Sequence, residues 1–138
     1  MKKTLILVTI LTLSCATDKD IDLSLLNGYW EIQSVTQNNK LLKTYPYSGI
    51  IDFFETDGKT GIRKKVNPKF NGKFTISLHQ INFNVIKIEE NTYIEYSDSN
   101  NIKFKETIKQ LDSLNLILTN KDNYTYHYKL YEQIVINE

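Results

Sequence analysis

The chain has 138 residues, enough for one domain of ordinary size and too few for two independent hydrophobic cores. Hydrophobic residues make up 41% and charged residues 24%, which excludes disorder, and nine Tyr and six Phe against two Pro favour β-strands. With 17 Lys and Arg against 16 Asp and Glu, bulk charge gives no basis for nucleic-acid binding. A single cysteine excludes a disulfide framework and a cysteine-rich zinc site.

The first fourteen residues have the order of a bacterial export signal. Lys2 and Lys3 precede an apolar run from Leu5 to Leu13 that only two threonines interrupt. This run is shorter than the roughly 17 to 25 residues that a transmembrane helix needs. We therefore expect residues 1–14 to be a signal peptide rather than a permanent membrane anchor.

A small residue, Ser14, stands directly before the only cysteine of the chain, Cys15. This pair resembles the lipobox of bacterial lipoproteins, in which the cysteine is acylated, for example with palmitate, and becomes the mature N-terminus. The family usually has Leu three residues before the cysteine, whereas here Leu13 is two before and Leu11 four before. The resemblance implies a lipid attached at Cys15 and a membrane lipid as partner; an unmodified cysteine after an ordinary secretory signal is the alternative.

The residues after the cysteine bear on the destination of the protein. In lipoproteins of enteric-type bacteria an aspartate after the cysteine favours the inner membrane, and here that position is Ala16. The resemblance therefore implies the outer membrane, with residues 15–22 as a short polar tether. Whether the domain faces the periplasm or the medium stays open.

From Gly28 onward, apolar and polar residues alternate with period two between turn-forming pairs, which predicts short antiparallel strands. Asn38-Asn39 and Asp57-Gly58 are expected to form tight turns. A switch in alternation at Ile86 predicts a bulge near Val85 or a strand covered on both faces. The strand candidates lie at about 29–37, 41–44, 50–55, 61–66, 74–79, 81–88, 92–97, 102–108, 114–118 and 124–131.

These candidates predict an all-β fold over residues 23–138, an up-and-down antiparallel β-barrel of eight to ten strands. Connections of two to six residues are too short for the crossovers of a parallel sheet. So many short strands with one apolar face must close or split into layers to cover their edges. A β-sandwich is the alternative architecture.

The segment Leu25-Leu26-Asn27-Gly28-Tyr29-Trp30-Glu31-Ile32 resembles the opening of lipocalin-like domains, with its short turn followed by Gly-x-Trp. The glycine turn after Phe53-Phe54 and the tyrosine-rich final strand are similar to lipocalin-like lipoproteins of Bacteroidota. The resemblance implies a monomeric barrel that binds a small apolar or amphipathic molecule in the cell envelope. In such a barrel Trp30 closes the floor, its N–H reaching a backbone carbonyl, and Gly28 avoids a clash there. The alternative is a turn glycine before an ordinary core tryptophan.

One polar residue interrupts an apolar face. Along Ile102, Phe104, Glu106 and Ile108, the alternation points Glu106 into the interior, where a carboxylate needs a partner. Arg63, the only arginine, could donate a forked pair of hydrogen bonds to it. Such an ion pair would either anchor the polar head of a ligand or satisfy only itself.

The final strand places Tyr124, Tyr126 and Tyr128 on one face, where they could line a cavity or fill the barrel. The candidate ligand-binding residues are therefore Arg63, Phe104, Glu106, Tyr124, Tyr126 and Tyr128.

Chemistry-bearing motifs are absent from the sequence. His79 and His127 are the only histidines and lie 48 residues apart, so we expect no metal site, no cofactor and no enzyme activity. Two functions remain: binding of a small molecule, or a structural or protein-interaction role in the outer membrane with a solidly packed barrel. A cavity of about 300 Å³ or more would favour the first, and an exposed apolar patch around Leu41, Leu42 and residues 45–47 the second.

Overall fold

The computed structural model describes residues 20–132 except 48, 70 and 102, and for residues 76–78 it describes the backbone alone. The predicted signal peptide, the lipid attachment at Cys15 and most of the 15–22 tether lie outside the described residues. Within the described part, no helix has the length and apolar character needed to cross a membrane.

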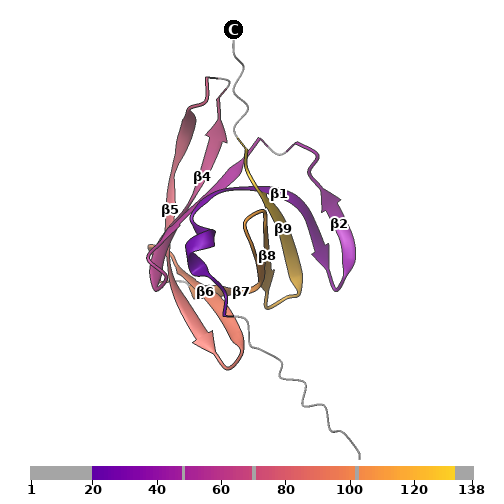
Figure 1. Ribbon diagram of the computed structural model, residues 1–138, viewed down its shortest axis with the longest axis vertical. Helices are drawn as coiled ribbons and strands as arrows, with labels where there is room; N and C mark the ends of the chain where they lie inside the picture. The colour runs from indigo at the N-terminus through magenta and orange to yellow at the C-terminus, as the bar shows by residue number, and fades with distance from the viewer. Residues whose placement is uncertain (1–19, 48, 70, 102, 133–138) are drawn as a thin grey trace, which may run out of the picture.

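The described chain is a short 3-10 helix followed by strands joined through tight turns (Figure 1). The elements are η1 (Leu23–Leu26), β1 (Gly28–Gln37), β2 (Lys40–Thr44), β3 (Ile51–Thr56), β4 (Thr60–Pro68), β5 (Phe74–Ile88), β6 (Asn91–Ser97), β7 (Lys103–Leu111), β8 (Asn115–Asn120) and β9 (Tyr124–Leu130).

The strands form one antiparallel sheet that closes on itself. Its order is β2-β1-β3-β4-β5-β6-β7-β8-β9, and an additional pairing of β1 with β9 closes the ring. β3 pairs with the first part of β1 and β2 with the last part of the same edge, so β2 lies outside the ring of eight strands. The predicted up-and-down antiparallel barrel is confirmed, and the β-sandwich alternative is wrong.

Two predicted turns have the backbone conformation that their residues favour. Asn38 and Asn39 have φ of 49° and 63°, the left-handed pair that a two-residue hairpin requires. Gly58 has φ of 92° in the turn between β3 and β4. Asparagine and glycine adopt positive φ more readily than other residues, so these positions determine where the chain reverses.

β5 differs from the sequence prediction. The candidates at 74–79 and 81–88 form one strand of 15 residues, Phe74–Ile88. The bulge predicted near Val85 is wrong, because β5 pairs with β6 without a break up to Ile88. The irregularity lies against β4, where the pairing steps from Lys64↔Gln80 to Val66↔Ile76. The change of alternation instead reflects exposure, since Ile88 is 46% exposed near the strand end.

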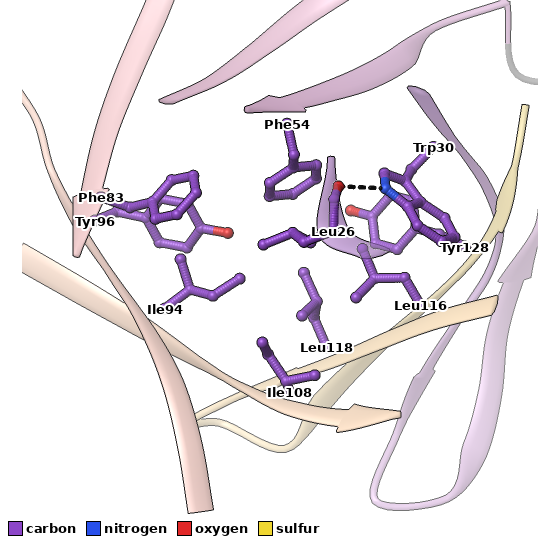
Figure 2. Close-up of a cluster of buried hydrophobic side chains, with 10 residues drawn as sticks. All are labelled: Leu26, Trp30, Phe54, Phe83, Ile94, Tyr96, Ile108, Leu116, Leu118 and Tyr128. Carbon is purple, nitrogen blue, oxygen red and sulfur yellow. Dashed lines mark hydrogen bonds between the residues drawn. The ribbon is translucent and has the colours of Figure 1, made fainter. Parts of the chain in front are cut away.

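Ten buried side chains fill the apolar interior (Figure 2). Leu26 comes from η1, which contacts β3 and β7 and so spans the interior between two separate parts of the wall. Trp30 is fully buried, and its Nε1 donates to the Leu26 carbonyl at 2.9 Å, as the floor prediction required. The other members are Phe54, Phe83, Ile94, Tyr96, Ile108, Leu116, Leu118 and Tyr128.

The predicted reason for Gly28 needs correction. A Cβ atom at this position would meet only Leu130 Cδ1 at 3.8 Å, which is an ordinary contact. Its φ of 131°, however, is a conformation that residues with side chains rarely adopt. Glycine is therefore required by the backbone angle with which the chain enters β1, and no clash with the barrel floor is involved.

Candidate functional site

Arg63, on β4, lies at the centre of a buried polar cluster. Its Nε and Nη2 donate to the two carboxylate oxygens of Asp52 at 3.3 and 3.1 Å. Nη1 donates to Glu106 Oε2 at 3.1 Å and to the Tyr96 hydroxyl at 2.9 Å. Nη2 also donates to the Tyr128 hydroxyl at 2.9 Å. A guanidinium has five N–H groups, so every donor of Arg63 is used within the protein.

The two phenols complete the cluster from opposite sides. The Tyr96 hydroxyl donates to Glu106 Oε2 at 2.8 Å, and the Tyr128 hydroxyl accepts from Arg63 Nη2 at 2.9 Å. In Figure 2 the two hydroxyls point toward the middle of the interior from facing walls. The cluster thereby joins β3, β4, β6, β7 and β9, and we call these five residues the Arg63 cluster.

Aromatic rings surround the guanidinium. Its central carbon lies 5.0 Å from the ring centroid of Phe54, 5.5 Å from that of Tyr96 and 5.9 Å from that of Tyr128. Cations at such distances are attracted to the ring faces, more strongly where water is excluded. The rings thus stabilise the charge of Arg63 in addition to the carboxylates.

The charges of the cluster balance only when Lys65 is counted. The side chains of Asp52 and Glu106 are 4% and 8% exposed, and both pair with Arg63. Lys65 places Nζ 2.7 Å from Asp52 Oδ1, with its own side chain 56% exposed. Although burial alone would raise the pKa of Asp52, the charges of Arg63 and Lys65 outweigh burial and lower it.

An open hollow of about 840 Å³ lies directly over the Arg63 cluster. Asp52, Arg63 and Tyr96 form part of its lining. The rest of the lining comes from β4, β5, the end of β6, the β6–β7 connection and β7: Lys64, Lys65, His79, Gln80, Ile81, Asn82, Ser97, Asp98, Ser99, Asn101 and Phe104. The hollow therefore combines a charged base with a partly apolar wall.

Phe104 lies on the same face of β7 as Glu106, as the alternation predicted, but it is not enclosed. Its side chain is 46% exposed at the wall of the hollow. The ring stacks on Tyr96, with centroids 4.6 Å apart and planes 21° apart. The expectation of an interior position is wrong, because alternation gives the face of a residue and not its depth along the barrel.

The three tyrosines of β9 separate from one another. Tyr128 is buried in the apolar interior and reaches Arg63, whereas Tyr126 is half-buried and packs against the same interior. Tyr124 is half-buried, and it belongs neither to the described core cluster nor to the lining of the hollow. The structure thus brings Arg63, Glu106 and Tyr128 together, with Phe104 beside them, and leaves Tyr124 and Tyr126 away from the hollow.

Three members of this site, Asp52, Tyr96 and Lys65, are not indicated by the sequence patterns. Asp52 stands in the apolar run Ile51–Phe54, where neighbouring residues on both faces are hydrophobic. Ile51 faces outward yet is fully buried, so the run has no solvent face to mark its orientation. The available signal was the aspartate itself, an acid within an apolar strand.

A separate apolar region covers the outside of the wall. Tyr29 lies 4.9 Å from Phe53 and stacks on Phe74 at 4.3 Å, and Phe74 meets Tyr131 at 6.0 Å between centroids. A second hollow of about 580 Å³ lies beside it. Two exposed hydrophobic residues, Tyr47 and Leu114, line this second hollow.

Among residues 20–132 as described, no group of three or more His, Asp or Glu side chains is arranged to hold a metal ion.

No protein-family model and no curated protein matches the chain. Solved structures do resemble it. A lipocalin-like protein from Bacteroides uniformis superposes with a TM-score of 0.49 at 12% identity, covering 78% of this chain and 99% of its own. An uncharacterized protein from Bacteroides eggerthii gives 0.47 at 11% identity, covering 77% and 99%. Lobster apocrustacyanin A1 gives 0.44 at 15% identity, covering 84% and 66%.

At these identities the likeness concerns the fold alone, and the barrel itself follows from the strand pairing described above. These structural neighbours include a lipocalin-like protein, as the resemblance in the sequence implied, and the barrel of this chain is established by its own strand pairing.

Proposed function

We propose that the protein is a binding protein of the cell envelope that holds a small amphipathic molecule in the hollow over the Arg63 cluster. The observation that carries this proposal is the volume of that hollow, about 840 Å³. Ligand pockets in proteins begin at about 300 Å³. Because side chains fill the apolar interior around Trp30, the ligand occupies the mouth of the barrel and not its closed end.

The chemistry of the lining supports an amphipathic ligand over a wholly apolar one. Phe104 and Tyr96 offer stacked rings, and Ile81 adds an aliphatic surface. Asp52, Arg63 and Lys65 make the base of the same hollow polar. A ligand with one apolar and one polar end can satisfy both parts without leaving a charge desolvated and unpaired.

A titration with a fluorescent fatty acid tests this proposal. We expect Phe104→Ser to weaken binding about tenfold, because burying a phenylalanine ring against a ligand contributes on the order of 1.5 kcal/mol. Leu114→Ser is the matched control, since Leu114 is 58% exposed in the β7–β8 turn and lines the other hollow. Equal affinities in all three proteins, or no binding by any, would refute the proposal.

We further propose that the barrel is attached to the outer membrane through an acyl chain on Cys15. The support is the order of basic residues, apolar run and Ser14-Cys15 in the sequence. Growth with an alkyne-labelled palmitate should label the wild-type protein. In the Cys15→Ser variant the label should disappear and the protein should leave the outer-membrane fraction. Retained label or an unchanged fraction would exclude this anchor.

A protein-interaction role is the second candidate, and the exposed Tyr47 and Leu114 at the outer hollow favour it. A photo-crosslinking amino acid placed in cells at position 47 or at position 104 separates the two roles. Tyr47 is 76% exposed on the outer side, whereas Phe104 borders the inner hollow. Crosslinks to a protein from position 47 support interaction, and a small added mass at position 104 supports ligand binding.

A further inference from the structure

The arginine in the hollow cannot receive a ligand headgroup without losing an existing partner. All five of its N–H groups donate to Asp52, Glu106 or a phenol, and the side chain is only 13% exposed. A ligand that displaced one of these acceptors would leave a buried polar group unpaired. Arg63 therefore forms the base of the hollow and is not its binding group.

Lys65 is placed differently although it belongs to the same strand. It lies two residues after Arg63, so both side chains leave the same face of β4. Its ammonium contacts Asp52 at 2.7 Å, yet its side chain is 56% exposed and lines the hollow. An ammonium has three N–H groups, and Asp52 accounts for one of them.

The carboxylates in the lining are already engaged. Asp52 is 4% exposed and pairs with both Arg63 and Lys65. Asp98 accepts a hydrogen bond from the backbone N–H of Asn100 at 2.8 Å in the β6–β7 turn. Lys65 differs from these carboxylates and from Arg63, since its side chain is more than half exposed. The polar end of the hollow thus offers donors to an incoming acid group.

We propose, building on the binding function above, that the ligand is an anionic amphiphile whose carboxylate pairs with Lys65 while its apolar body lies on Phe104. The two side chains border the same hollow from β4 and β7. Phe104 presents an exposed ring backed by Tyr96. This arrangement favours a ligand with a negative charge at the end near Lys65 and apolar surface at the end near Phe104.

Competition against the fluorescent fatty acid tests the proposal on the full chain, with dodecanoic acid and dodecanol as competitors of equal chain length. We expect wild-type protein to prefer the acid about tenfold, as a charge-assisted hydrogen bond in a half-buried site warrants. Lys65→Met should abolish this preference and leave dodecanol affinity unchanged, whereas Lys65→Arg should retain it.

Lys105→Met is the matched control, because it removes the same charge from the outer face of β7, where Nζ lies 5.3 Å from the Tyr93 ring centroid. Equal binding of acid and alcohol by the wild type overturns the proposal while the binding function stands. If neither competitor nor probe binds, the binding function fails with it. Should Lys65→Met not fold, the acid-to-alcohol ratio of the wild type and of Lys65→Arg decides.

Discussion

The barrel contains two unlike regions that share a wall. Around Leu26 and Trp30 the interior is apolar and filled, and one directional bond, from the indole to the Leu26 carbonyl, crosses it. At the Arg63 cluster nearly every contact is directional and each group has a specified partner. The stability of the first region depends on how completely side chains fill its interior volume. The stability of the second depends on ion pairs and hydrogen bonds, so substitutions should affect the two regions by different mechanisms.

Tyr96 and Tyr128 belong to both regions. Their rings are members of the apolar cluster, and their hydroxyls bond to Arg63. Burial raises the pKa of both phenols, which keeps both hydroxyls neutral beside the buried carboxylates. The two regions are therefore coupled through two side chains rather than through the backbone alone.

The largest effect is expected from Arg63→Met. This change leaves Glu106 buried without its cation and leaves Asp52 with Lys65 alone. Removing one partner of a buried ion pair costs about 3 to 5 kcal/mol, and here two carboxylates lose the same partner. We expect the free energy of unfolding, measured by urea denaturation, to fall by about 4 kcal/mol.

A combined variant makes that prediction sharper. Arg63→Met together with Asp52→Asn and Glu106→Gln removes the buried charges along with the cation, so part of the lost stability should return. If the triple variant is less stable than Arg63→Met, or if Arg63→Met costs under about 1 kcal/mol, the ion pairs of Arg63 do not determine the stability of this region.

A smaller loss of stability is expected from Leu118→Ala in the apolar region. Leu118 is fully buried, and removing its side chain leaves a cavity that costs about 3 kcal/mol. Because Leu118 does not line the hollow over the Arg63 cluster, the affinity for the fluorescent fatty acid should stay unchanged. A loss of affinity comparable to that of Phe104→Ser would show that the two regions are not separable.

Much of the fold could be predicted from local patterns. Alternation with period two located the strands of the ring because each of them has an inner apolar face. Asn38-Asn39 and Asp57-Gly58 indicated the turns through their tolerance of positive φ. The length of β5 could not be predicted, because the irregularity opposite Lys64 and Val66 depends on how two strands pair and not on one strand's sequence.

The site could be predicted in part. Glu106 interrupts an apolar face and Arg63 is the only arginine, so their ion pair followed from sequence and is present at 3.1 Å. The predicted forked geometry is wrong, because the fork of Arg63 binds both oxygens of Asp52 and Glu106 accepts a single bond from Nη1. Asp52 could not be oriented, because the aromatic cover around Tyr29 and Phe53 makes the outside of the wall apolar as well. Whether a side chain is enclosed, as for Phe104, depends on where the barrel opens, which no single strand encodes.

The smallest effect is expected at high pH, where the phenols that link the two regions lose protons. Tyrosines in the unfolded chain ionise near pH 10, whereas the pKa values of Tyr96 and Tyr128 are raised in the folded barrel. Above that pH the unfolded state binds fewer protons than the folded state, so stability falls as pH rises. Two such groups lower the free energy of unfolding by about 1 to 2 kcal/mol near pH 10.5.

Tyrosinate absorbance and urea denaturation, measured on the same samples, check this expectation. Tyr96 and Tyr128 should ionise only together with unfolding, whereas exposed tyrosines such as Tyr47 ionise in the folded protein. The alternative outcome, full ionisation of all nine tyrosines before any loss of structure, would mean that water reaches the phenols. In that case the Arg63 cluster would be a hydrated part of the hollow, and the two phenols would not couple it to the stability of the apolar region.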